Sequence, residues 1–332
     1  MDRRRFLLTS LAGALAAPLA AAQQAGKVFR LGFLSGLPNH PLIPLLVVAL
    51  NDRGWVEGRD FVLDSRSSNQ DPDGAAGLAE ALLRQGVDVI VTVNTAHALA
   101  ARKTTNTVPI VMFTSGFPVE AGLAQSLARP GGNVTGLSIY AGTALFGKYV
   151  ELLREVAPSL RELGVMWGYT PPAFADMEME ISLGELRRGA RALNINPRVW
   201  ITRTDRDVSD ALAAAAEAPI GALFVTASTI YARPANAPRI TDFIVRRRLP
   251  WLTDFGGPLF EAGGLLLYST NFNDLARRTA YFIDRIRQGA KPGDLPIEQP
   301  TKYELVINLK TAKAIGLTIP PSLLARGDRV IE

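Results

Sequence analysis

Apolar and polar residues alternate along the first half of the chain in blocks that predict strands and helices in turn. Strands are predicted at 27–34, 61–65, 87–91 and 108–113. Helices are predicted at 42–51, at 75–84 and from Thr95 onward. Gly54 and Gly86 follow the first two helices, where a C-cap glycine is expected. Because parallel neighbours need a crossover, this alternation indicates a parallel sheet.

The same order of elements returns in the second half with different residues. Strands are predicted at 162–167, 197–201 and 222–225, with helices at 179–193 and 208–216. An internal duplication of a doubly wound unit is the simplest account of this repeat. Two such lobes leave a cleft between the carboxyl ends of their strands, where open α/β sheets bind ligands.

The remaining segments predict more than one connection between the lobes. Pro130–Gly136 is rich in turn residues and leads into a first crossing, while a strand at 265–268 and a helix at 274–288 exceed what one lobe needs. We therefore expect an α/β protein of two doubly wound parallel-sheet lobes joined by a multi-strand hinge. Residues 27–138 and 270–325 are assigned to the first lobe, and 139–269 to the second.

The N-terminus has the pattern of a secretory signal peptide. Arginines at 3–5 precede an apolar run at 11–17, and Ala20-Ala21-Ala22 offers a small-residue cleavage site before Gln23. The Arg-Arg-x-Phe-Leu start fits the twin-arginine route, and an ordinary Sec signal with an incidental arginine remains an alternative. We therefore expect export to the periplasm with cleavage near Ala22.

Composition narrows the class of protein. The chain of 332 residues has no cysteine, which excludes a lipoprotein anchor, disulfides and thiolate ligands. The formal charge of +5 falls to +3 without residues 1–22, which hold three arginines and one aspartate, so nothing indicates nucleic-acid binding. No later apolar stretch has the length of a membrane span, and we expect a soluble monomer.

Several long segments resemble the substrate-binding proteins of ABC transporters that include tryptophan- and tyrosine-binding members. The resembling segments cover essentially the whole mature chain: 30–35, 53–58, 86–91, 127–136, 261–265, 295–313 and 316–324. The resemblance implies a type I periplasmic binding fold, a small-molecule ligand enclosed by lobe closure and delivery to an inner-membrane ABC permease. The chain departs from the family pattern at Phe117, in the loop after Trp167 and at Ser228, so the ligand can differ from those of known members.

An amino acid ligand needs hydrogen-bond donors for its carboxylate and an acceptor for its ammonium group. Asn94, Thr95 and Ala96 open a helix after a buried strand, and such a helix N-terminus suits an anion. Ser115 and Gly116 hold the corresponding place after the next strand. Thr95 and Ser115 could equally serve as helix caps. Ser35 and Asn39 follow the first strand and complete the candidates of the first lobe.

For the ammonium group, Asp254 is the best candidate, because it follows the strand at 250–253. Its alternative role is an N-cap for the helix after Gly256 and Gly257. Ser228 follows another strand of the second lobe. Aromatic side chains predicted in strand-end loops could hold an aromatic or cationic ligand: Phe117, Tyr140, Tyr169, Tyr231 and Tyr268.

Catalytic and metal chemistry find little support. His40 and His97 are the only histidines, and no carboxylates accompany them at a recognisable zinc-ligand spacing. There is no G-x-S-x-G elbow, phosphate-binding loop or dinucleotide fingerprint. We therefore expect no cofactor, no metal and no enzyme activity. A periplasmic sensor that presents its ligand to a receptor kinase is the main alternative, and an exported α/β enzyme is a third.

Overall fold

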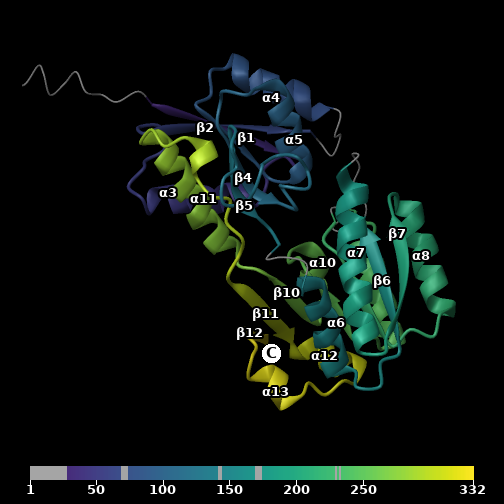
Figure 1. Cartoon of the computed structure of the whole chain (residues 1–332). Coiled ribbons are helices and arrows are strands. Elements are labelled where there is room, and N and C mark those ends of the chain that lie inside the picture. The colour runs from purple at the N-terminus through teal and green to yellow at the C-terminus, as the bar shows by residue number, and fades with distance from the viewer. Residues whose placement is uncertain (1–27, 69–73, 141–143, 169–173, 229, 232) are drawn as a thin grey trace, which may run out of the picture.

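A computed structural model of the chain describes residues 28–68, 74–140, 144–168, 174–228, 230–231 and 233–332, and it contains two separate sheets (Figure 1). The first sheet contains β1 (Phe29–Ser35), β2 (Phe61–Ser67), β3 (Val89–Thr92), β4 (Ile110–Ser115) and β5 (Val134–Ser138). Its order is β2-β1-β3-β4-β5, and all of its pairs are parallel. The predicted signal peptide lies outside the described residues.

The second sheet is larger and contains one antiparallel pair. Its strands are β6 (Glu162–Gly168), β7 (Asn196–Thr202), β8 (Ala222–Val225), β9 (Trp251–Thr253), β10 (Leu266–Thr270), β11 (Tyr303–Asn308) and β12 (Arg329–Ile331). The order is β12-β11-β10-β9-β8-β6-β7, with β10 and β11 antiparallel. Each sheet and the helices around it form what we call the first lobe and the second lobe.

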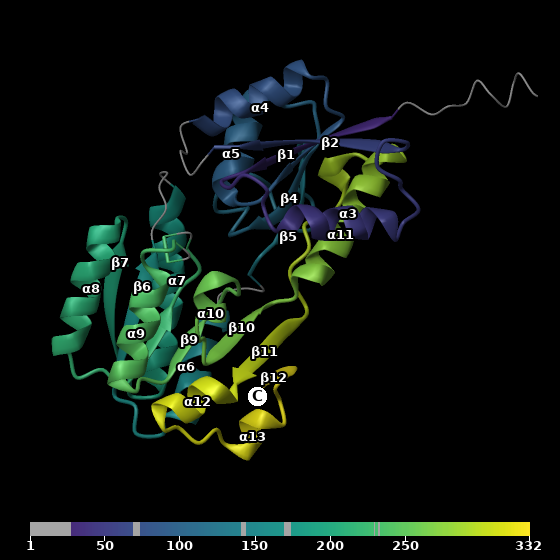
Figure 2. The same cartoon turned by 180° about the vertical axis from the view of Figure 1, so that it is seen from behind.

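Helices cover both faces of the first sheet. They are α3 (Leu42–Asn51), α4 (Gly74–Arg84), α5 (Thr95–Thr104) and α11 (Phe272–Arg287). One apolar cluster joins α3 and α11 to one face, and another joins α4 and α5 to the opposite face. After β10 of the second lobe, the chain thus returns to the first lobe as helix α11. Figures 1 and 2 show α11 lying beside α3.

The helices of the second lobe enclose a single large apolar cluster. They are α6 (Ala144–Val156), α7 (Phe174–Ala192), α8 (Asp205–Glu217), α9 (Ala237–Arg247), α10 (Pro258–Glu261), α12 (Leu309–Ile315) and α13 (Pro321–Leu324). Helices α6 and α7 pack on one face, and α8, α9 and α12 lie on the other (Figure 2). Strand β8 is buried along its whole length, as expected for a parallel strand between two helix layers.

Local signals account for many of the boundaries. Asn94 accepts a hydrogen bond from His97 N as the N-cap of α5, and Asn271 does the same for Asp274 N at α11. Thr204 and Asp207 form a reciprocal capping box at α8. Gly316 ends α12 in the left-handed conformation. The predicted elements therefore form where hydrophobic period and capping residues agree.

The assignment of residues 270–325 to the first lobe is wrong from β11 onward. Strand β11 pairs with β10, and β12 pairs with β11, so both belong to the second sheet. Leu309, Ala312 and Leu323 add to the apolar cluster of the second lobe. The C-terminal segment therefore completes the second lobe after α11 has packed on the first.

Three connections link the lobes, and they are hydrogen-bonded to one another. The chain crosses after β5, between β10 and α11, and through residues 298–302 before β11. Ser138 N donates to Glu298 O at 2.8 Å, and Glu298 N donates to Gly136 O at 3.0 Å. Asn271 N donates to Lys302 O at 3.3 Å. A hinge of this kind restricts the lobes to few relative motions.

Gly136 holds the first crossing in register. Its φ is +117°, and a Cβ atom there would overlap the Met112 backbone beside the register shift between β4 and β5. Gly136→Ala should lower the free energy of unfolding by about 2–4 kcal/mol, from backbone strain and overlap together. Urea denaturation measures this loss.

Gly132→Ala is the matched control, because a Cβ atom at position 132 meets no atom within 4 Å. The control should stay within about 1 kcal/mol of the native protein. Equal stability of the two variants would contradict the role given to Gly136.

Candidate functional site

The carboxyl ends of the first sheet bring together most of the predicted residues of the first lobe. Thr95 Oγ1 donates to Gly116 O at 3.1 Å and accepts from Gly116 N at 2.9 Å, which ties the loops after β3 and β4 together. Ser115 is fully buried, and its Oγ has no hydrogen-bond partner among the described residues. Ser35 is also buried and donates to Leu37 O at 2.9 Å. Ala96 is partly exposed, whereas Asn39 is exposed with φ +51°.

His97 supports this edge as a neutral side chain. Its Nδ1 lies 2.6 Å from Asn94 Oδ1, which already accepts from His97 N, so Nδ1 carries the proton and donates. Nε2 then accepts from Ser68 Oγ at 3.4 Å. Burial, and to a smaller extent nearby His40, lowers the pKa of His97 to about 4. His40 Nδ1 likewise accepts a hydrogen bond from Leu42 N at 3.2 Å, so both histidines hold segments of the first lobe in place.

An aromatic run crosses from the first lobe to the second. The ring centroids of Phe117 and Tyr140 are 5.1 Å apart, those of Tyr140 and Phe146 are 5.4 Å apart, and those of Phe146 and Trp167 are 6.0 Å apart. Phe117 adopts φ +43°, a left-handed conformation that costs about 1–3 kcal/mol for such a residue. The ring of Phe117, a residue with a strained backbone, therefore lies against Tyr140 at the start of the hinge.

Asp254 follows β9 at the facing edge of the second lobe. Its Oδ1 accepts a hydrogen bond from Ala227 N at 2.5 Å, and burial raises its pKa to about 7. It does not cap the next helix, because the N-cap of α10 is Gly257 and no side chain caps that helix. The capping alternative is therefore wrong, and the carboxylate is held at the end of β9 by a neighbouring loop.

Glu178 is a residue of this site that the sequence did not single out. It lies on α7, and its Oε1 is 2.5 Å from the place that a Cβ atom of Gly116 would occupy, so the second lobe touches the first here. The Tyr140 hydroxyl donates a hydrogen bond to the Glu178 carboxylate. Burial raises the pKa of Glu178, and this hydrogen bond lowers it by less. We call Gly116, Phe117, Tyr140, Glu178 and Asp254 the interlobe cluster.

Two other predicted residues lie in the loop after β8, at the same edge of the second sheet as Asp254. Tyr231 is fully buried, and its hydroxyl is 2.6 Å from Thr202 Oγ1. Ser228 Oγ accepts from Ile230 N at 3.4 Å next to it. Tyr169 lies outside the described residues.

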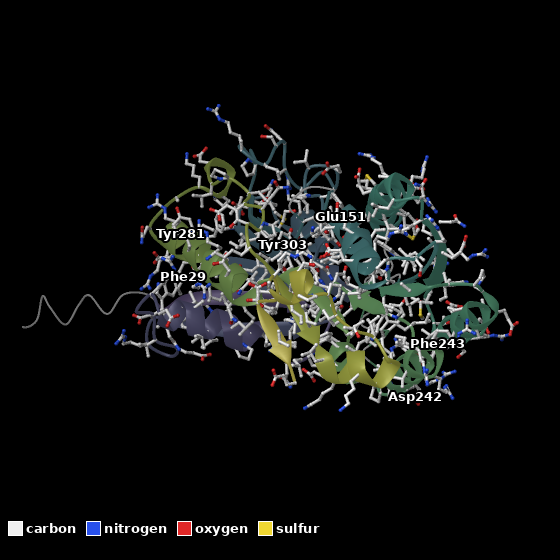
Figure 3. The ribbon with its side chains drawn as sticks, turned by 90° about the horizontal axis from the view of Figure 1, so that it is seen from below. Phe29, Glu151, Asp242, Phe243, Tyr281 and Tyr303 are labelled. Carbon is white, nitrogen blue, oxygen red and sulfur yellow. The ribbon has the colours of Figure 1, made fainter. Side chains whose placement is uncertain are left out.

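Tyr268 lies within β10 rather than in a loop, and it stacks on Tyr303 with ring centroids 5.5 Å apart. Lys148 and Glu151 of α6 also lie near it. Figure 3 labels Tyr303 and Glu151 on this side of the molecule. The placement of Tyr268 therefore follows from packing on the second sheet.

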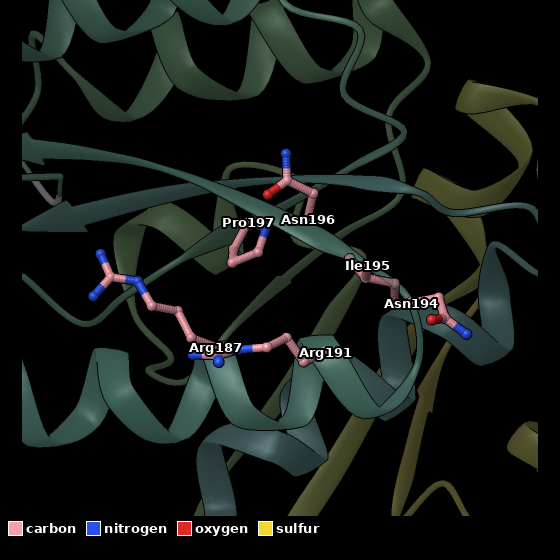
Figure 4. Close-up of a pocket in the computed structure, with 6 residues that line it drawn as sticks. All are labelled: Arg187, Arg191, Asn194, Ile195, Asn196 and Pro197. Atoms are coloured by element: carbon pink, nitrogen blue, oxygen red, sulfur yellow. The ribbon is translucent and has the colours of Figure 1, made fainter.

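A surface depression on the second lobe is separate from the interlobe cluster. It is lined by Arg187, Arg191, Asn194, Ile195, Asn196 and Pro197 (Figure 4). These residues lie where α7 ends and β7 begins, at the amino edge of the sheet. The Asn196 side chain is engaged with the Glu162 carboxylate at 3.0 and 3.1 Å. The depression is thus at the opposite edge from the facing strand ends.

The raised pKa of Asp254 predicts a pH-dependent stability. A folded-state pKa of about 7 exceeds the unfolded value, so the stabilisation that Asp254 confers is complete below about pH 4 and is lost as the pH rises through 7. Asp254→Asn should therefore raise the melting temperature at pH 8 by roughly 2–4 °C and leave it nearly unchanged at pH 4. Thermal melts at pH 4, 6 and 8 measure this.

Asp242→Asn removes the same charge from an exposed position on α9 and is the control (Figure 3). It should show little change between pH 4 and 8. An equal rise of the melting temperature at pH 8 in both variants would contradict the prediction that ionising the buried Asp254 destabilises the fold more than ionising an exposed aspartate.

Comparison with known proteins places this architecture. The sequence pattern of the family described as ABC transporter substrate binding protein matches residues 46–331. A tyrosine-binding protein of Clostridioides difficile (strain R20291) is 24% identical over 288 residues, which are 86% of this chain and 80% of that protein.

Solved structures share the fold. An ABC domain from Streptococcus pneumonia in complex with L-Trp superposes with a TM-score of 0.79 at 23% identity, covering 92% of this chain and 100% of that one. A conserved domain protein from Vibrio cholerae gives a TM-score of 0.80 at 25% identity over the same shares. The expected type I periplasmic binding fold with two lobes is confirmed. The chain belongs to the ABC transporter substrate-binding protein family.

Proposed function

We propose that this chain binds an amino acid or a related small organic ligand between its two lobes and delivers it to an ABC permease in the inner membrane. The observation that carries the site is the contact of Glu178 in the second lobe with Gly116 in the first. The contact means that the carboxyl edges of the two sheets face each other, and such edges are where open α/β sheets bind ligands. The relatives that bind tyrosine and tryptophan support an amino acid as the ligand class.

The proposed work of the protein is conformational. A ligand that touches both lobes favours the closed arrangement, because it binds that arrangement better than the open one. The N–H groups at the N-terminus of α5 would receive a carboxylate, with Thr95 and Gly116 holding that loop in place through their mutual hydrogen bonds, and Asp254 would receive an ammonium group. Aromatic rings at Phe117 and Tyr140 would lie beside the rest of the ligand. The family is one of binding proteins rather than an enzyme class, and we expect no turnover of the ligand.

The test of ligand binding uses the mature chain from Gln23, unfolded and refolded to remove bound solute. Thermal shift against the common amino acids and aromatic acids at millimolar concentration should find a stabilising ligand. At 100 times Kd, the stabilisation is about 2.7 kcal/mol. Small-angle scattering should then show a smaller radius of gyration with that ligand. A chain that no compound stabilises or compacts would contradict the proposal.

Thr95→Val tests the site within that experiment. Loss of the Oγ1 hydroxyl removes the two hydrogen bonds that fix the loop of Gly116, and the misplacement of that loop should raise Kd about 3- to 10-fold. Thr104→Val is the control, because Thr104 Oγ1 donates to Ala101 O near the other end of the same helix. Equal affinities of the two variants would remove Thr95 from the site.

We propose export to the periplasm, with the pattern of residues 1–22 as support. Cell fractionation should find the chain outside the cytoplasm, and mass spectrometry should find Gln23 as its first residue. Replacing Arg3 and Arg4 by lysine should block export if the twin-arginine route is used and spare it if Sec is used. An unprocessed chain that stays in the cytoplasm would contradict this proposal.

A further inference from the structure

The carboxylate of Glu178 lies where it can contact a ligand bound at the interlobe cluster. Helix α7 follows β6 in the second lobe, yet Glu178 Oε1 lies 2.5 Å and Tyr140 Cε2 lies 3.0 Å from the Cβ position of Gly116. Glycine at 116 leaves the space that the carboxylate and the ring fill. The carboxylate therefore reaches the loop where a ligand carboxylate was expected to bind, and its negative charge opposes an anion there.

A second carboxylate acts on the same tyrosine. The negative charges of Glu178 and Asp254 both help to raise the pKa of Tyr140. The charge of Asp254 also helps to raise the pKa of Tyr149 and of Tyr231. Burial raises the pKa of Glu178 and of Asp254. Among the residues that the structure describes, no arginine, lysine or histidine lowers either pKa.

The loops around the cluster supply no free cation. The strand-end loops of the first lobe, at 35–41, 67–74, 92–97, 115–122 and 138–144, contain no lysine or arginine, and neither do those at 168–174 and 253–258. In the second lobe, Arg233 pairs with Asp205 at 2.9 Å, and Arg203 lies beside Asp207. The positive charge that would balance two carboxylates must therefore come with the ligand.

We propose that Glu178, together with Asp254, binds a positively charged nitrogen of the ligand, and that the site thereby selects organic cations over zwitterions of the same shape. This proposal rests on the proposed function. A zwitterion offers one ammonium group and brings a carboxylate of its own, so one protein carboxylate would be enclosed without a partner, which is costly. A ligand of charge +1 reduces the net charge of the two ionised carboxylates from −2 to −1, whereas a zwitterion leaves it at −2. Phe117 and Tyr140 add ring faces that favour a cation with an apolar or aromatic body.

Matched ligand pairs test the selection. Isothermal titration at pH 8, above the pKa of about 7 of Asp254, compares tyramine with tyrosine, tryptamine with tryptophan, and arginine with citrulline. The first member of each pair has a net charge of +1 and the second is neutral overall. The cation should bind at least 10-fold more tightly in every pair that binds. Pairs in which the neutral member binds as well or better would overturn the proposal.

Glu178→Gln tests the residue. It keeps the shape and an acceptor for the Tyr140 hydroxyl but removes the charge, so the preference for the cation should fall about 10-fold. Glu180→Gln is the matched control, since Glu180 is exposed on the same helix. Melting temperatures of both variants verify folding. A preference that is unchanged in Glu178→Gln would remove Glu178 from the site.

The two proposals fail in different ways. A neutral amino acid that binds native protein and Glu178→Gln equally would overturn the inference about charge and leave the proposed function standing. A chain that binds none of the six compounds, and that no solute in the wider screen stabilises, would overturn both.

Discussion

The hinge hydrogen bonds constrain everything that the two lobes can do. The backbone of Glu298 forms hydrogen bonds with Gly136 and Ser138, on either side of Leu137. Its carboxylate accepts a hydrogen bond of 2.7 Å from Nε of Arg278, which lies on helix α11. A crossing segment of the chain is thereby tied to another crossing and to a helix of the first lobe. Because three connections are bonded together, the facing edges of the two lobes can approach only along a restricted path.

That restriction explains how residues far apart in sequence share one site. Gly116 begins the loop after β4 of the first lobe, Tyr140 begins the first crossing and Glu178 lies on α7 of the second lobe. Their contact places groups of both lobes in one site. The strained backbone conformation of Phe117 directs its ring against Tyr140, whereas a relaxed backbone would point the ring in another direction.

Much of the fold was predictable because its signals are local. Apolar period gave the strands and helices of both lobes, and Asn94 and Thr95 lie at a helix N-terminus because they follow the buried strand β3. The C-terminal segment was misassigned because β11 joins the second sheet through an antiparallel pair with β10, which hydrophobic period cannot reveal. Tyr268 was expected in a loop but lies within β10, whereas Tyr231 lies in the loop after β8 as expected, with its side chain fully buried.

Glu178 was missed for a more general reason. The pattern of α7 predicts an amphipathic helix, but nothing in its period distinguishes Glu178 from Asp176 or Glu180, which are exposed. Only the approach of the other lobe gives one of these acids a special environment. The usable signal was its place in the early turns of a helix that follows a strand end, where side chains face the cleft.

Charge and closure are coupled if a ligand cation is held between Glu178 and Asp254. Both acids belong to the second lobe, whereas Gly116 and the N-terminus of α5 belong to the first. A ligand that touched one lobe alone would bind open and closed forms equally and shift nothing. Phe117 gives the ligand a contact with the first lobe, while the two carboxylates contact the ligand from the second lobe. A cation with a ring or apolar body would therefore favour closure, whereas a small inorganic cation at the same carboxylates would not.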